Sequence, residues 1–316
     1  MMELRTILAV ISTLFGIATI VIDVLILIAI FGHRRSYYRS HFFYVIYMVG
    51  VLVDIVALAN CHLLALLPSK GLFLDTFISS TKLGRLFLFL AWSTRTCQGF
   101  TNFFMALNRV TAIVSPIWSQ SSIRGLCFTV QFGVGIGVGL VAAVLNVYWC
   151  NTSGDSWYIQ FYDTPSTHLF FDYVFALITF FSLLTIAAYA VLLFNFQAVS
   201  RKNARRSAST ESDGEAKNEQ SLVYLAICVC TMEVMYYVMY CYGFVMNANF
   251  ELSLETIYVS YFLLTDLYSG VPPYLLILFS TPIRQDVGRI VSPLLNRILR
   301  RIEYNVTPLS VNEARV

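Results

Sequence analysis

Seven long apolar stretches constrain this chain more than any other feature of its 316 residues. An α-helix rises about 1.5 Å per residue, so roughly 20 mostly apolar residues are needed to cross a bilayer. The stretches that reach this length are residues 7–31, 42–67, 83–114, 125–149, 170–197, 221–247 and 255–280. Charged residues make up only 12% of the chain, whereas soluble domains carry about 25%. The sequence therefore predicts an all-α membrane protein, a bundle of seven transmembrane helices.

The distribution of lysine and arginine predicts the orientation of this bundle, because these residues collect on the cytoplasmic side of membrane proteins. If the N-terminus lies outside, 16 of the 21 basic residues fall in inner loops and the tail, and four fall outside. The remaining one, Arg95, lies within the third span. This asymmetry predicts an extracellular N-terminus and a cytoplasmic C-terminus. The sequon at Asn151 then falls in the second outer loop, where it is a candidate for glycosylation.

The chain divides into a transmembrane domain, residues 1–281, and a C-terminal region, residues 282–316. Apolar residues recur at helical spacing after the seventh span, and arginines occupy the other faces. This pattern predicts an amphipathic helix on the cytoplasmic membrane surface, followed by a tail. Pro293 lies inside this pattern and is expected to break or kink the helix.

Composition and motifs weigh against several other functions. The net charge is only +3, so nothing indicates a nucleic-acid partner. The four histidines form no HExxH motif, the chain has no GxSxG motif, and the seven cysteines show no CxxC metal spacing. No nucleophile and base can be paired, so the sequence does not predict an enzyme. Four alternate glycines, residues 133–139, have the small-residue spacing that suits close helix packing within one chain or in a dimer, and the sequence leaves dimerisation undecided.

Charged residues within the spans are the main functional candidates, because such residues are costly in a bilayer. Counted by helical rise, Arg95 lies roughly 18 Å below the outer end of its span. Asp54, Glu233 and Asp266 fall at a similar depth, close to the midplane. An unpaired buried charge costs several kcal/mol, so Arg95 is expected to pair with Glu233 or Asp266. These four residues form either a polar cluster that fixes helix packing or a switch that responds to a ligand or an ion.

Arg109 is placed differently, at the inner end of the third span. It follows Arg95 by fourteen residues, roughly 21 Å and almost four helical turns, so both arginines face nearly the same side. Taken alone, Arg109 is compatible with a snorkelling side chain at a helix end.

Two sequence motifs resemble those of a known family. The stretch LNRVTAIVSPIW, residues 107–118, resembles the Asn-Arg-x-Thr motif of nematode serpentine chemoreceptors, and PPYLLILFSTPIR, residues 272–284, is similar to the same group. The closest resemblance is to the gamma-class superfamily, near its class V or class gamma members. These proteins are seven-helix G-protein-coupled receptors. The resemblance covers about residues 5–300.

The resemblance implies a receptor in the plasma membrane of sensory neurons that detects a small chemical ligand and couples to a heterotrimeric G protein. It implies that Asn108 and Arg109 form the G-protein switch, and that Asp54 is a span-two acid of the kind that helps to bind sodium. No other cofactor is implied. Asn108 stands where better-known receptors carry an acid that holds the switch arginine inactive, so the resting-state contact of Arg109 is unexplained by sequence.

The candidate ligand pocket lies among the outer halves of spans three, five, six and seven. Its candidate lining residues are Arg95, Gln98, Tyr237, Tyr240 and Tyr261. Each of them is also compatible with ordinary packing, since pockets use only a few convergent polar groups. A transporter or ion pathway is the alternative, because midplane acids and a buried arginine also suit proton or ion relays. Transporters tend to show internal repeats and matching broken helices, and this sequence shows neither.

Overall fold

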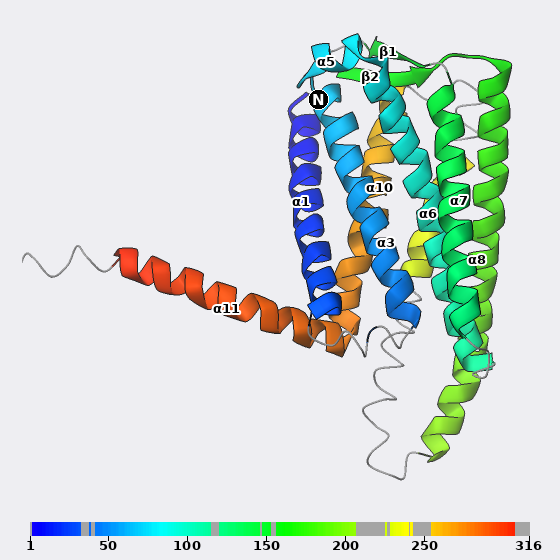
Figure 1. Cartoon of the computed structure of the whole chain (residues 1–316), viewed down its shortest axis with the longest axis vertical. Helices are drawn as coiled ribbons and strands as arrows, with labels where there is room; N and C mark the ends of the chain where they lie inside the picture. The colour runs from blue at the N-terminus through cyan, green and yellow to red at the C-terminus, as the bar shows by residue number, and fades with distance from the viewer. Residues whose placement is uncertain are drawn as a thin grey trace, which may run out of the picture.

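The computed structural model describes residues 2–32, 38, 42–114, 120–145, 147–152, 156–206, 225, 228–239, 241–242 and 254–306. Long helices run side by side along one axis and form a bundle (Figure 1). The bundle helices are α1 (Met2–Gly32), α3 (Phe42–Ala59), α6 (Thr81–Val114), α7 (Gln120–Val144), α8 (Pro165–Arg206) and α10 (Leu254–Phe279), with a further helical stretch at Cys228–Met239. Five of the described helices are long and apolar enough to cross a membrane, which makes the chain a multi-pass membrane protein.

The helix α6 is not among those five, and its position explains why. It contacts α3, α7 and α8, so it lies inside the bundle with little surface left for lipid. Its buried side chains include a run of polar ones, namely Ser93, Thr94, Thr96, Gln98, Thr101 and Asn102. Polar groups are tolerated at membrane depth where they face the bundle interior and find partners there. The less apolar composition of α6 therefore follows from its central place.

Two glycines of α7 allow its close approach to α6. A Cβ atom at Gly139 would collide with the side chain of Ser93, and one at Gly135 would collide with the sulfur of Cys97. The alternate residues Gly133 and Gly137 have no such neighbour among the described atoms. Half of the glycine pattern is therefore used for packing within one chain, as small residues are at membrane helix interfaces.

The second span contains a π-helical segment that the sequence did not reveal. The helix α3 continues into η1 (Asn60–Leu66), a π-helix, and then into the short α4 (Leu67–Ser69) and α5 (Leu74–Ser79). A π-helical turn inserts an extra residue and rotates the side chains that follow it. It therefore changes which helix His62 faces.

A two-stranded hairpin lies between α7 and α8, where the sequence predicted only an outer loop. Strand β1 (Val147–Thr152) pairs antiparallel with β2 (Ser156–Phe161), with Cys150 opposite Tyr158. The hairpin contacts α4, α6 and α10 and covers the end of the bundle where α5 lies (Figure 1). Phe161 packs edge-on against Phe171 at the start of α8, which ties the hairpin to the bundle.

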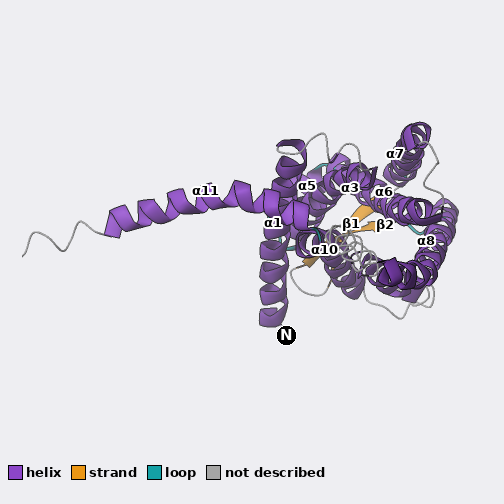
Figure 2. Ribbon diagram, turned by 90° about the horizontal axis from the view of Figure 1, so that it is seen from below, coloured by secondary structure: helices purple, strands orange, loops and turns teal. Residues whose placement is uncertain are grey.

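The helix α11 (Thr281–Val306) leaves the opposite end of the bundle and runs away from it, almost perpendicular to the bundle axis (Figures 1 and 2). Its first turns are held by Tyr38, whose hydroxyl donates to Asp286 Oδ2 at 2.7 Å, and by the fully buried Ile283. The helix continues through Pro293, so the expected break there is wrong. Proline costs one intrahelical hydrogen bond, and here the helix accommodates that loss.

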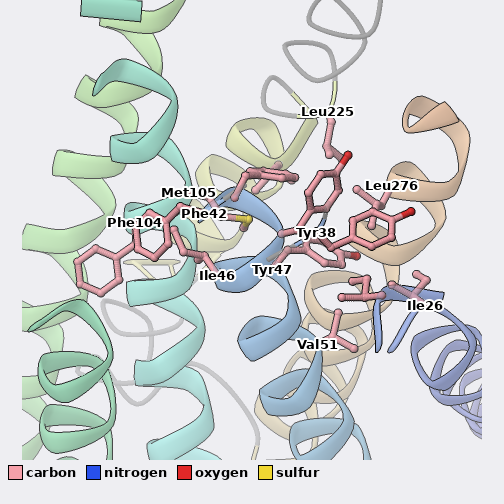
Figure 3. Close-up of a cluster of buried hydrophobic side chains, with 14 of the residues drawn as sticks. Ile26, Tyr38, Phe42, Ile46, Tyr47, Val51, Phe104, Met105, Leu225 and Leu276 are labelled. Carbon is pink, nitrogen blue, oxygen red and sulfur yellow. The ribbon is translucent and has the colours of Figure 1, made fainter. Parts of the chain in front are cut away.

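The hydrophobic core at this end of the bundle joins residues from four regions of the chain. Figure 3 shows Ile26, Tyr47, Phe104 and Leu276 within one cluster, contributed by α1, α3, α6 and α10. A second cluster, which includes Phe87, Phe170 and Phe262, fills the half nearer the hairpin. Between these two apolar clusters lie the buried polar side chains described next.

Candidate functional site

Arg95 is the cation that α6 places inside the bundle, fourteen residues from the start of this helix. Its guanidinium packs against two tyrosine rings that also contact each other, with its central carbon 3.3 Å from the ring centre of Tyr236 and 3.9 Å from that of Tyr268. Such contacts stabilise a cation by about 2 kcal/mol or more when desolvated. Its Nη2 lies 3.9 Å from Glu233 Oε1, so Arg95 contacts one of its two expected acid partners.

Glu233 is only 2% exposed and is held mainly by groups other than Arg95. Ser182 of α8 donates to Oε1 at 2.9 Å, and Asn102 of α6 donates to Oε2 at 3.1 Å. The hydroxyl of Tyr268, from α10, also donates to Oε2. Three hydrogen bonds therefore satisfy the carboxylate, while the contact with Arg95 is longer than a hydrogen bond. The cluster of Arg95, Asn102, Ser182, Glu233, Tyr236 and Tyr268 connects α6, α8, α10 and the stretch Cys228–Met239; we call it the Arg95 cluster.

A small cleft opens beside this cluster, between α6 and α8. It is lined by Arg95, Thr96, Gly99, Phe100, Leu177, Ile178, Phe181, Ser182 and Glu233. Its volume is about 20 Å³, close to the room that one water molecule needs. Within the part of the chain that the structure describes, Nε and Nη1 of Arg95 are buried and have no hydrogen-bond partner. The cleft therefore has largely apolar walls, and Arg95, one of its lining residues, carries two buried donors without a partner.

Asp54 of α3 belongs to a separate network. Gln98 of α6 donates its amide to Asp54 Oδ1 at 2.6 Å and to Ser269 Oγ at 2.8 Å. A sodium ion would need several oxygen ligands around Asp54. Close to Asp54 Oδ1 lies instead a hydrogen-bond donor, the amide of Gln98. Among the described residues, no group of three or more His, Cys, Asp or Glu side chains could hold a metal ion. Because this carboxylate already accepts a hydrogen bond from Gln98, no function is derived from a sodium ion at Asp54.

Asp266 of α10 forms a third network, away from Arg95. Its Oδ1 lies 3.1 Å from Nε2 of His62, and Ser12 of α1 donates to its Oδ2. The His62 ring packs against Gly16 of α1, where any Cβ atom would collide with it. By direct side-chain contact, the four midplane residues divide into Arg95 with Glu233, Asp54 with Gln98, and Asp266 with His62. Similar depth does not make two side chains neighbours, because their rotation about the helix axis also matters.

Arg109 lies in the same helix as Arg95, at the end of the bundle from which α11 leaves. Its guanidinium carbon is 4.0 Å from the ring centre of Phe43, a residue of α3. A small cavity at this end is lined by Arg109 with Phe43, Tyr47, Met105, Tyr189, Leu225 and Val229. The neighbouring Asn108 is half-buried, and its carbonyl accepts a hydrogen bond of 3.1 Å from Thr111 Oγ1. Arg109 thus contacts the ring of Phe43, and the residue before it in the sequence is Asn108 rather than an acid.

Of the remaining pocket candidates, the structure describes the side chains of Gln98 and Tyr237. Gln98 is engaged by Asp54 and Ser269, and Tyr237 is half-buried but does not line the cleft. Tyr240 lies outside the described residues, as do the side chains of Tyr261 and Asn151, whose backbones lie in α10 and β1.

Several residues of the Arg95 cluster escaped the sequence reasoning, although a signal existed for some. Asn102 follows Arg95 by seven residues and Tyr236 follows Glu233 by three, so each pair shares a helix face. Searching each charged residue's own helix face for polar and aromatic neighbours would have found both. Ser182 and Tyr268 come from other helices, and no spacing rule within one helix reveals them.

The comparison with protein families agrees with this geometry. The model of the family described as "Serpentine type 7TM GPCR chemoreceptor Srv" matches residues 13–292, which is most of the chain. Among curated proteins, none matches it. The match extends from the first bundle helix to the first half of α11 and includes both arginines of α6. The chain therefore belongs to the Srv family of serpentine seven-transmembrane chemoreceptors, which are G-protein-coupled receptors and not enzymes.

Proposed function

We propose that this chain binds a small chemical ligand beside Arg95 and signals through the far end of α6 to a heterotrimeric G protein. Membership of the chemoreceptor family supports the general role. The observation that carries the specific proposal is the Arg95 cluster, which joins four helical segments through one acid and one base.

The Arg95 cluster is suited to a switch because its members lie on different helices. Ser182 reaches Glu233 from α8, and Tyr268 reaches it from α10. A ligand that alters one of these contacts changes how α8 and α10 pack against α6. A ligand shifts a conformational equilibrium only by its differential affinity for the two states. Contacts that differ between the two arrangements supply such a difference.

The helix α6 provides the connection to the cytoplasmic end. Arg109 follows Arg95 by fourteen residues, so roughly 21 Å of continuous helix separates them. In the resting arrangement Arg109 packs on Phe43 of α3. When α6 moves relative to α3, Arg109 leaves this ring and becomes available to the G protein. The contact with Phe43 thus helps to hold Arg109 in this arrangement, where Asn108 provides no acid.

The test is a signalling assay in cells that express the full chain. A panel of small volatile and water-soluble chemicals is applied, and calcium or cAMP is recorded beside an Arg109→Ala variant. The proposal predicts a ligand that signals through the wild type and not through the variant, at equal surface expression. A ligand response that survives Arg109→Ala would refute the switch role of Arg109.

A further inference from the structure

The hydrogen-bond inventory of the cleft between α6 and α8 restricts the chemistry of a ligand. Two nitrogens of Arg95, Nε and Nη1, are buried without a partner among the described residues. Leaving such donors unsatisfied costs free energy, and more so for a charged group. A buried polar group of this kind needs a partner, which is either water or a ligand atom.

The other polar groups that line the cleft already have partners. Thr96 donates its hydroxyl to the carbonyl of Trp92 at 2.8 Å, and Ser182 donates to Glu233 at 2.9 Å. Both oxygens of Glu233 accept hydrogen bonds. Among the described lining residues, Arg95 therefore has buried donors that need an acceptor, and no acceptor needs a donor.

The charge balance of the site decides whether that acceptor is ionised. Arg95 and Glu233 carry opposite charges and compensate each other at 3.9 Å. A carboxylate ligand would bring a second negative charge close to Glu233 in a poorly hydrated place, where repulsion is strong. An ammonium ligand would be repelled by Arg95 and would present donors only. A neutral acceptor satisfies Arg95 without disturbing this balance.

The side chains that line the cleft indicate the chemistry of the part of the ligand that does not contact Arg95. Phe100, Leu177, Ile178 and Phe181 surround the approach to Arg95 with apolar surface. Apolar contacts of this kind suit a hydrocarbon body, whose burial stabilises a complex in proportion to its area. The present volume of about 20 Å³ is too small for such a molecule. Binding must therefore separate α8 from α6 locally, which couples occupancy to helix movement.

Building on the proposed function, we propose that the ligand of this receptor is an uncharged molecule with a carbonyl-type acceptor on an apolar body. Its carbonyl oxygen accepts a hydrogen bond from one of the two unpartnered nitrogens of Arg95, Nε or Nη1, and its hydrocarbon part lies between Phe100 and Phe181. Ketones, esters and lactones of modest size have this chemistry. Carboxylates, alkylamines and plain hydrocarbons of the same length do not.

The experiment measures binding directly, so that it does not depend on G-protein coupling. The purified full chain in lipid nanodiscs is heated with methyl ketones of increasing length and with the carboxylate, amine and alkane of each length. We expect the ketones to raise Tm in a concentration-dependent way and the matched compounds to bind at least about tenfold more weakly. If a carboxylate or an amine stabilises the receptor more than its matched ketone, the inference is wrong. If no ketone raises Tm, Arg95 holds water only and the inference is also wrong.

Variants localise the binding site. Arg95→Met combined with Glu233→Gln removes both charges together, which avoids an uncompensated buried ion, and is expected to abolish the ketone effect. Phe181→Trp narrows the cleft without touching Arg95 and is expected to shift the preferred ketone to a shorter one. His62→Gln, at another buried polar network, is the matched control and should leave ketone binding unchanged. Ketone binding that survives loss of Arg95 would overturn the assignment.

The two proposals fail in distinguishable ways. Ketone binding without any cellular response would leave the ligand class intact and contradict the proposed signalling. A cellular response confined to amines or carboxylates would leave the signalling intact and contradict the ligand class.

Discussion

The two arginines of α6 have the same chemistry and the same helix, yet their surroundings differ. Arg95 packs against two rings, beside an acid that three other groups hold in place. Arg109 lies over the ring of Phe43 at the end of the bundle from which α11 leaves. The first arrangement connects four helical segments, whereas the second connects α6 to α3. We therefore expect loss of the Arg95 cluster to lower stability more than loss of Arg109 does.

The largest loss of stability is expected from Glu233→Leu, which leaves Arg95 as an uncompensated buried charge. Removing one partner of a buried pair typically costs about 3–5 kcal/mol, so surface expression and Tm should both fall strongly. The double variant Arg95→Met with Glu233→Leu should recover most of the loss. If the double variant is no more stable than Glu233→Leu alone, the two residues do not act as a pair.

The next effect concerns function rather than stability. Arg109→Ala should abolish ligand-dependent signalling while lowering stability by only about 0.5–2 kcal/mol, the range of one cation–π contact. Surface labelling and the signalling assay, made on the same cells, separate the two quantities. A variant that loses surface expression as severely as Glu233→Leu would show that Arg109 is as structural as the Arg95 cluster.

A third prediction concerns the ring beneath Arg109. Phe43→Leu removes the cation–π contact and part of the packing, so we expect a loss of about 1–2 kcal/mol and raised signalling without ligand. Phe43→Tyr keeps a ring in place and serves as the control, with basal signalling near that of the wild type. Unchanged basal signalling in Phe43→Leu would argue against a resting-state contact between Phe43 and Arg109.

The smallest effect is expected at Tyr236. Tyr236→Leu removes one of the two rings around Arg95, while Tyr268 still covers the guanidinium. We expect a loss of about 0.5–1 kcal/mol, measured as a modest fall in Tm of the purified receptor. A loss as large as that of Glu233→Leu would mean that the rings, and not the acid, keep Arg95 buried.

Much of the fold was predictable because a bilayer imposes a strong rule on composition. Apolar length alone marked spans such as residues 170–197, which lie within α8, and the chemoreceptor resemblance of the motif around Arg109 is confirmed by the family match. The hairpin β1–β2 was not predicted, because a short loop outside the membrane carries no comparable rule. The π-helix η1 was not predicted either, since its extra residue leaves the apolar pattern of the span unbroken.

The membrane depth of the buried charged residues was predictable from the sequence, but the side chains that each of them contacts were not. Counting helical rise placed Arg95, Asp54, Glu233 and Asp266 at one level, and the structure assigns them to three networks. Rise along a helix follows from residue number, whereas the facing direction of a side chain depends on how each helix is rotated in the bundle. The rotation of His62 by η1 toward α1 and α10 is an example, because it gives Asp266 a partner other than Arg95.

The sequence alone determined that this chain is a membrane bundle, how its ends are expected to be oriented, and which few residues carry charge inside it. These follow from the cost of placing polar groups in hydrocarbon, which acts on each residue by its position along the chain. The tertiary structure decided which acid meets which base, that two tyrosine rings pack against Arg95, and that Phe43 lies under Arg109. Those contacts join helices distant in sequence, and only their packing brings the side chains together.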